Sequence, residues 1–163
     1  MRQSIEGFMN KFMYRRYGLF AVSLFVNAMG IALITKALLG TSPITSVTYV
    51  LSMFTPLTIG QWTIALNLLF VLLELPFMTW RELKDDLRMF LLQIPISLCF
   101  GTFIDVCMNM LYWVEPVTYI SQIAYLLVGC VVLAAGITLE VKADVAMMAG
   151  EYFVRVISKR FHG

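Results

Sequence analysis

Charged residues are scarce in this 163-residue chain, at 13% of the sequence, and this scarcity argues against a soluble domain. A soluble domain carries about 25% charged residues because its surface must stay hydrated. Hydrophobic residues make up 60% of the chain, and its mean hydropathy is +0.83. The composition therefore predicts an integral membrane protein whose first partner is the lipid bilayer. A net charge of only +2 argues against a nucleic-acid partner.

Residues with catalytic or metal-binding chemistry are also few. His162 is the only histidine and lies in the C-terminal tail, and Cys99, Cys107 and Cys130 form no C-x-x-C pair. These absences argue against a metal site within the membrane and against a disulfide framework. The chain also lacks the serine-hydrolase, zinc-protease, P-loop and Rossmann patterns. We therefore expect no enzyme, no metal and no cofactor.

Long hydrophobic runs, in contrast, are abundant. Four of them are long enough to cross a hydrocarbon core of about 30 Å as helices, and a spanning segment in lipid must satisfy its own backbone hydrogen bonds. The sequence thus predicts an all-α polytopic membrane protein with one transmembrane domain over residues 1–163. The four predicted spans are residues 17–36, 60–80, 89–112 and 118–140.

Two further segments are too short to cross the membrane. Residues 43–54 begin after Ser42, a good N-cap, with a proline at the first helical position, and they stop before Thr55-Pro56. This segment fits either a helix in the outer interface or one that re-enters the membrane. Residues 146–161 mix basic and apolar side chains and fit a cytoplasmic interfacial helix. We treat both segments as half-helices.

Basic residues gather on one predicted side of the membrane. They precede the first span, separate the second from the third, and follow the fourth, whereas residues 37–59 and 113–117 contain none and Lys36 is the only basic residue near that side. Because basic loops stay in the cytoplasm, both termini are predicted to be cytoplasmic.

An offset of 106 residues aligns two copies of the motif G-I-x-L-x-x-K-A, at residues 30–37 and 136–143. Each copy lies at the end of a predicted span and precedes a short segment. The spans between the copies place Lys36 at the outer end and Lys142 at the inner end. The pattern predicts an inverted repeat, an arrangement found in secondary transporters.

Three segments show a further pattern. They read FVNAMGIALITKALLGTSPITSV at residues 25–47, LLQIPISLCFGTFID at 91–105 and GITLEVKA at 136–143. Together they resemble the YitT/YczE-like family of bacterial integral membrane proteins. The resemblance implies a bacterial cytoplasmic-membrane protein, with transport as one suggested role. Because family members usually continue into another spanning helix, the resemblance also implies a chain that is shortened at its C-terminus.

Charged residues within the spans predict two ion pairs. A carboxylate at membrane depth costs about 2.5–3.5 kcal/mol on insertion scales, so it needs a partner or a function. Asp105 shares the outer half with Lys36, and Glu74 shares the inner half with Lys142. These pairs fit either passive clamps or gates that break in turn. Ser97, Gly101 and Asp105 also share one helical face, a small-residue stripe that we expect to pack against another helix.

A transporter-like core would enclose a cavity with polar walls. Its lysines and helix N-termini favour an anionic or zwitterionic solute. The two asparagines near mid-depth fit either solute contact or interhelical hydrogen bonds of about 0.6 kcal/mol. Glu140 and Asp144 are rival partners for the second lysine. The candidate cavity residues are Asn27, Lys36, Ser42, Thr45, Asn67, Asp105, Glu140 and Lys142.

Two alternatives to a transporter stay open. One is a non-transporting membrane scaffold or accessory subunit, which would have a lipid-tight interior. The other is a shortened, inactive relative. Because four spans are few for a closed path, a homodimer or a partner membrane protein is expected to complete the walls.

Overall fold

The computed structural model describes residues 2–74, 87–143 and 158, with side chains described over residues 16–73 and 91–143 and at residue 158. Within these residues every regular element is a helix, which confirms the predicted all-α class. Three stretches are long and apolar enough to cross a membrane: Arg16–Lys36, Leu91–Met110 and Tyr119–Ala143. Their length and composition indicate a membrane protein.

The first helix, α1 (Arg2–Lys36), begins well before the predicted span at residue 17. No proline interrupts the polar residues before that span, so the helix continues through them. At its other end the chain turns at Leu38, which has a φ of 57°, and at Gly40, which has a φ of 136°. Left-handed backbone of this kind stops an α-helix and redirects the chain.

The short helix α2 (Pro43–Phe54) has the predicted bounds 43–54. The Ser42 side chain accepts a hydrogen bond from the Thr45 backbone N–H at 3.3 Å, and Pro43 occupies a position where no N–H is needed. The helix buries Thr45 and Thr48. Its exposed side chains are apolar and include Val47, Val50, Met53 and Phe54. A helix in water shows the opposite pattern, so the exposed face of α2 is typical of contact with lipid.

Three more helices correspond to the remaining predicted spans. They are α3 (Ile59–Glu74), α5 (Leu87–Met110) and α6 (Tyr119–Ala143). Over its described residues α3 has 16 residues, or about 24 Å of helix, which is less than the roughly 30 Å of a bilayer core. Residues 75–80 of the second predicted span lie outside the described residues, as does all of the predicted segment 146–161 except Ser158.

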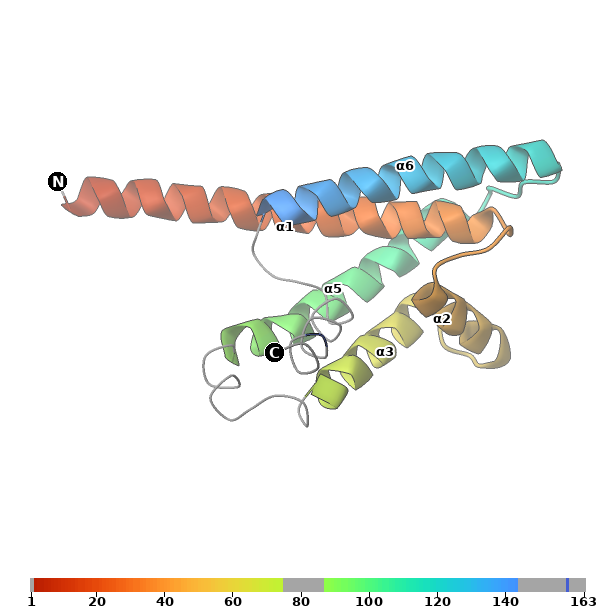
Figure 1. Cartoon of the computed structure of the whole chain (residues 1–163), viewed down its shortest axis with the longest axis horizontal. Coiled ribbons are helices and arrows are strands. Elements are labelled where there is room, and N and C mark those ends of the chain that lie inside the picture. The colour runs from red at the N-terminus through yellow and green to blue at the C-terminus, as the bar shows by residue number, and fades with distance from the viewer. Residues whose placement is uncertain (1, 75–86, 144–157, 159–163) are drawn as a thin grey trace.

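The helices pack in the order α6, α1, α5, α3, α2, as a row rather than a closed ring (Figure 1). The most extensive contact joins α1 and α6, which lie side by side and run in opposite directions. The first and last described helices are therefore neighbours. In contrast, α2 follows α1 in the sequence but packs mainly against α3.

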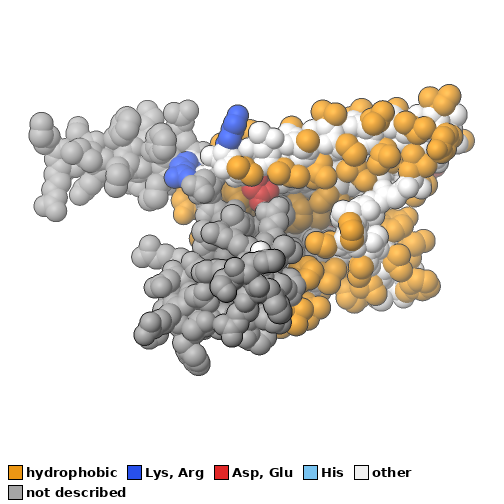
Figure 2. Space-filling model, in the orientation of Figure 1, with side chains coloured by type: hydrophobic (Ala, Val, Ile, Leu, Met, Phe, Trp, Pro, Cys, Tyr) orange, Lys and Arg blue, Asp and Glu red, His pale blue; other side chains and the backbone are white. Residues whose placement is uncertain are grey.

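The hydrophobic core lies mainly between α1 and α5. On α1, Phe20, Leu24 and Ala28 recur at every fourth residue and are buried, and on α5 they are joined by Phe100 and Ile104. This spacing places the α1 side chains on one face of the helix. Elsewhere the exterior is apolar, and Figure 2 shows hydrophobic side chains over much of the described part of the visible face. An apolar exterior over a modest core is expected of a protein whose solvent is lipid.

Candidate functional site

The backbones of α1 and α6 approach very closely at two glycines. A Cβ atom built on Gly30 would lie 2.8 Å from the Leu133 backbone N, and one built on Gly136 would lie 2.9 Å from the Asn27 backbone N. No ordinary side chain fits at such distances. The two helices thus meet through glycine, as helices in membranes often do.

A buried polar pair lies in this interface. The Asn27 Nδ2 donates a hydrogen bond to Glu140 Oε2 at 2.7 Å. Asn27 is 1% exposed and Glu140 is 7% exposed. Asn27 lies near the middle of the apolar stretch Arg16–Lys36, so an ionisable side chain is held beside the middle of a membrane-spanning helix. The structure brings these two predicted cavity residues together.

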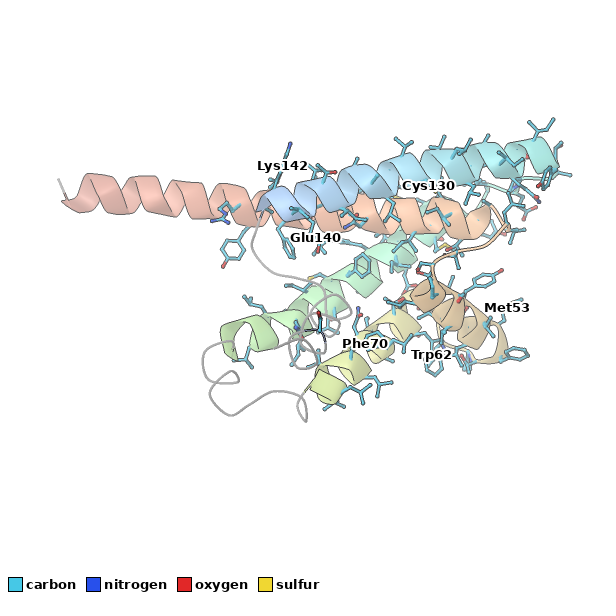
Figure 3. The ribbon with its side chains drawn as sticks, viewed as in Figure 1. Met53, Trp62, Phe70, Cys130, Glu140 and Lys142 are labelled. Atoms are coloured by element: carbon cyan, nitrogen blue, oxygen red, sulfur yellow. The ribbon has the colours of Figure 1, made fainter. Side chains whose placement is uncertain are left out.

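Lys142 does not share this position. It is exposed, and its side chain lies on the opposite side of α6 from Glu140 (Figure 3). Positions two residues apart on a helix differ by about 200°, which explains the separation. The Glu74 side chain lies outside the described residues, and the predicted Glu74–Lys142 pair lies outside them with it. Near the same end of α6, Arg16 Nε donates a hydrogen bond to the Ala143 carbonyl oxygen at 2.9 Å.

Asp105 binds the N-terminus of α3, whereas the sequence analysis paired it with Lys36. Its Oδ1 accepts a hydrogen bond from the Gly60 backbone N–H at 2.9 Å, and its Oδ2 accepts one from the Thr58 hydroxyl at 2.7 Å. A helix N-terminus offers unpaired N–H groups and a partial positive charge, so it satisfies a carboxylate without a lysine.

Close packing of α3 on α5 brings this carboxylate to the helix end. A Cβ atom on Gly60 would lie 2.6 Å from Asp105 Cγ, and one on Gly101 would meet Ile64 and the Gly60 carbonyl. The small-residue stripe predicted on α5 therefore packs against another helix, which is α3, at Gly101. The pattern Thr58-x-x-Gln61 adds a capping box, because Gln61 N bonds to Thr58 Oγ1 and Thr58 N bonds to Gln61 Oε1. The sequence carried this signal, but the prediction did not use it.

Lys36 lies instead beside an open groove where α1 ends. The groove has a volume of about 420 Å³ and is formed by α1, α2, α5 and the segment that joins α5 to α6. We call it the Lys36 groove. Its lining residues are Thr35, Lys36, Leu38, Tyr49, Met108, Val114, Glu115, Pro116 and Val117. Sequence reasoning missed Tyr49 and Glu115, because neither lies within a predicted span.

The other predicted cavity residues lie elsewhere. The hydroxyls of Ser42 and Thr45 are 2.8 Å apart and bond to each other at the start of α2, outside the lining of the Lys36 groove. Asn67 is buried on α3. Gln93 on α5 is 2% exposed, and neither its Oε1 nor its Nε2 has a hydrogen-bond partner among the described residues. The eight predicted residues are thus spread over the bundle rather than gathered around one cavity.

Comparison with known proteins gives a family but no described relative. No curated protein and no solved structure matches the chain. A family model, described as a family of unknown function (DUF6198), matches residues 14–163, which include every described helix beyond the first turns of α1. The match does not test the resemblance to the YitT/YczE-like family, which stays a prediction. With a match over nearly its whole length, the chain belongs to the DUF6198 family.

Proposed function

We propose that this chain is a small-solute transporter-like protein of the bacterial cytoplasmic membrane, built on an inverted repeat with four spanning helices and two half-helices. Three long apolar helices and an apolar exterior support the membrane setting. The proposed relationship to YitT/YczE-like proteins agrees with this setting. The argument for transport rests on how α1 and α6 meet.

The offset of 106 residues between the two motif copies relates two contacts between α1 and α6 to each other. Adding 106 to the numbers of Gly30 and Asn27 gives Gly136 and Leu133. The contact of Gly30 with Leu133 therefore corresponds to the contact of Gly136 with Asn27, and both are present. A twofold axis between the helices would produce this exchange and would send the two motif lysines to opposite ends. This pair of equivalent contacts is the observation that carries the proposal.

A buried acid at the interface of two repeats is the second support. Ionisable residues within spanning segments mark substrate or ion pathways by default. Glu140 is held by Asn27 in the α1–α6 interface, which is where inverted-repeat transporters place their sites. In the proposed mechanism, the two repeats rock about this interface and open the site to one face of the membrane at a time.

Side-specific labelling tests the inverted topology. Lys36→Cys and Lys142→Cys are made in a chain whose three native cysteines are replaced by serine, and intact cells are treated with a membrane-impermeant maleimide. We expect Lys36→Cys to react in intact cells and Lys142→Cys to react only after permeabilisation. Reaction of both positions from the same side would overturn the inverted repeat.

Uptake into proteoliposomes tests transport itself. Radiolabelled amino acids and small organic anions are offered to vesicles that contain the wild-type chain, Glu140→Gln or Thr138→Ala. Thr138→Ala is the matched control because Thr138 is exposed on the same helix and its hydroxyl bonds only to the Ala134 carbonyl oxygen. We expect uptake by the wild type and the control, and reduced uptake by Glu140→Gln. Wild-type uptake equal to that of protein-free vesicles would refute transport.

A membrane scaffold is the second candidate, and the outer face of α6 favours it. Most of this helix is exposed, and most of its exposed side chains are apolar, including Leu127, Val131 and Val141; Thr138 and Lys142 are exposed polar residues on the same helix. Such a face fits a neighbouring helix as well as lipid. Cys130 is exposed on it (Figure 3), so disulfide crosslinking of native membranes tests a homodimer through α6. A scaffold without transport predicts a Cys130 crosslink together with no uptake.

A further inference from the structure

The Lys36 groove brings together the two signs of charge. Lys36 enters it from the end of α1, and Glu115 enters it from the segment between α5 and α6. Although both line the same groove, they form no ion pair with each other, and Asp105, the carboxylate expected to hold Lys36, is bound to α3. Among the described residues, neither charged group has an ion-pair partner, so each is open to a ligand or to water.

The rest of the groove is mostly apolar. Leu38, Met108 and Pro116 contribute apolar surface, and Tyr49 adds an aromatic ring from α2. The volume of about 420 Å³ lies within the range of about 300–1,000 Å³ that is typical of small-molecule sites. An apolar wall with two charges of opposite sign favours a small molecule that carries both charges and an apolar portion.

We infer that the Lys36 groove binds a zwitterion with an ammonium group, an acidic group and an apolar portion, with Lys36 holding the acid and Glu115 holding the ammonium. The inference rests on the proposed function in one respect. If the chain is a transporter, the zwitterion is the class of substrate that enters at this end of the bundle. Two sources offer this chemistry. One is a free amino acid with an apolar side chain, and the other is the ethanolamine headgroup of a phospholipid.

The pairing of a lysine with a carboxylate in one groove favours a zwitterion over a simple anion. A lone lysine at a membrane boundary attracts any anion, but a carboxylate in the same groove repels one. A ligand with both charges meets an opposite charge at each end, so the pair of residues raises selectivity more than affinity. The groove also lies at the opposite end of α1 from Arg16, on the side where basic residues are scarce.

Calorimetric titration of the full chain tests the inference directly. The protein is placed in nanodiscs of phosphatidylglycerol alone, so that no zwitterionic lipid competes. The probes are leucine, leucinamide, which lacks the carboxylate, 4-methylpentanoate, which lacks the ammonium, and glycerophosphoethanolamine. Because a hydrogen bond to a charged group contributes about 1.5–3 kcal/mol, we expect the zwitterion to bind at least about tenfold more tightly than either single-charge analogue.

Two variants assign the charges. Lys36→Gln is expected to remove the preference for leucine over leucinamide, and Glu115→Gln is expected to remove the preference for leucine over 4-methylpentanoate. Thr138→Val, on the exposed face of α6, serves as the control and should bind as the wild type does. Equal binding by the wild type and both groove variants would overturn the inference, as would equal affinity for the zwitterion and its single-charge analogues.

The outcomes also separate the inference from the proposed function. Leucine as the tighter probe identifies a free amino acid, and glycerophosphoethanolamine as the tighter probe identifies a lipid headgroup; either result supports the groove. Zwitterion binding without any uptake refutes transport and leaves the groove standing. Uptake that is unchanged in Lys36→Gln and Glu115→Gln refutes the groove and leaves transport standing.

Discussion

Replacement of Gly136 by alanine is the most direct test of the close packing between α1 and α6. The new Cβ atom would lie 2.8 Å from Asn27 Cγ and 2.9 Å from the Asn27 backbone N. Because a backbone atom within a helix moves only together with that helix, we expect α1 and α6 to move apart. Gly18→Ala on α1 is the matched control, because a Cβ atom there meets nothing within 4 Å.

The magnitude follows from three contributions. Alanine in place of a helical glycine stabilises the helix by about 0.5–1 kcal/mol, and this gain is all that Gly18→Ala should show. At residue 136 overpacking costs about 1–3 kcal/mol. Displacement of Asn27 also weakens its hydrogen bond to Glu140, which is worth about 0.6 kcal/mol in a membrane. The net effect of Gly136→Ala is a loss of about 1–3 kcal/mol in the free energy of unfolding.

Thermal unfolding of the purified chain in detergent, followed by tryptophan fluorescence, measures the difference. For a chain of this size 1 kcal/mol corresponds to about 2–4 °C in Tm, so Gly136→Ala should unfold about 2–12 °C below the wild type. Gly18→Ala should unfold at or above the wild-type temperature. Gly30→Ala meets the equivalent contact with Leu133 and should resemble Gly136→Ala. A Tm for Gly136→Ala that equals or exceeds that of Gly18→Ala would refute the packing argument.

Three further stability measurements follow from the same contacts. Asp105→Ala removes both hydrogen bonds to the start of α3 and should lower the free energy of unfolding by about 0.5–2 kcal/mol. Lys36→Met should change the free energy of unfolding by less than about 0.5 kcal/mol, and equal losses for the two variants would favour an ion pair between Asp105 and Lys36. Glu140→Leu leaves the buried amide of Asn27 without its acceptor and should lower the free energy of unfolding by about 1–3 kcal/mol. Glu140→Gln retains an acceptor and should unfold near the wild-type temperature. Similar Tm values for the two variants would show that the hydrogen bond between Asn27 and Glu140 contributes nothing. Gly40→Ala forces a side chain onto a φ of 136° and should cost about 1–3 kcal/mol, and an unchanged Tm would show that the turn relaxes freely.

The helices were predictable because each has a local signal. Long apolar runs located α5 and α6 to within three residues at each end, and Ser42-Pro43 before the first turn with Pro56 after the last fixed both bounds of α2. The start of α1 was not predictable from hydropathy, since the helix continues into polar residues that need no lipid. Hydropathy gives the length of helix that lies in the membrane, and the whole helix can be longer than that.

The contacts between helices were harder to predict, because the depth of a residue in the membrane does not show which neighbouring helix its side chain faces. Lys36 and Asp105 were paired by depth alone. The sequence does not show that α3 begins beside Asp105, and a backbone N-terminus competes well with a lysine for a carboxylate. Asn27 and Glu140 were both candidates, but 112 residues lie between them, and only the antiparallel α1–α6 packing joins them. Tyr49 and Glu115 were not predicted as site residues, because they belong to no sequence motif and only the folded structure places them in the Lys36 groove.

The neighbourhood of α1 and α6 has a consequence for biosynthesis. The ribosome delivers α1 first and α6 last among the described helices, so α1 enters the bilayer long before its main partner exists. Until then the Asn27 amide lacks the Glu140 carboxylate that accepts its hydrogen bond in the folded chain. Assembly is thus completed by the arrival of the last helix, and a chain that stalls before Glu140 would leave a polar side chain facing lipid.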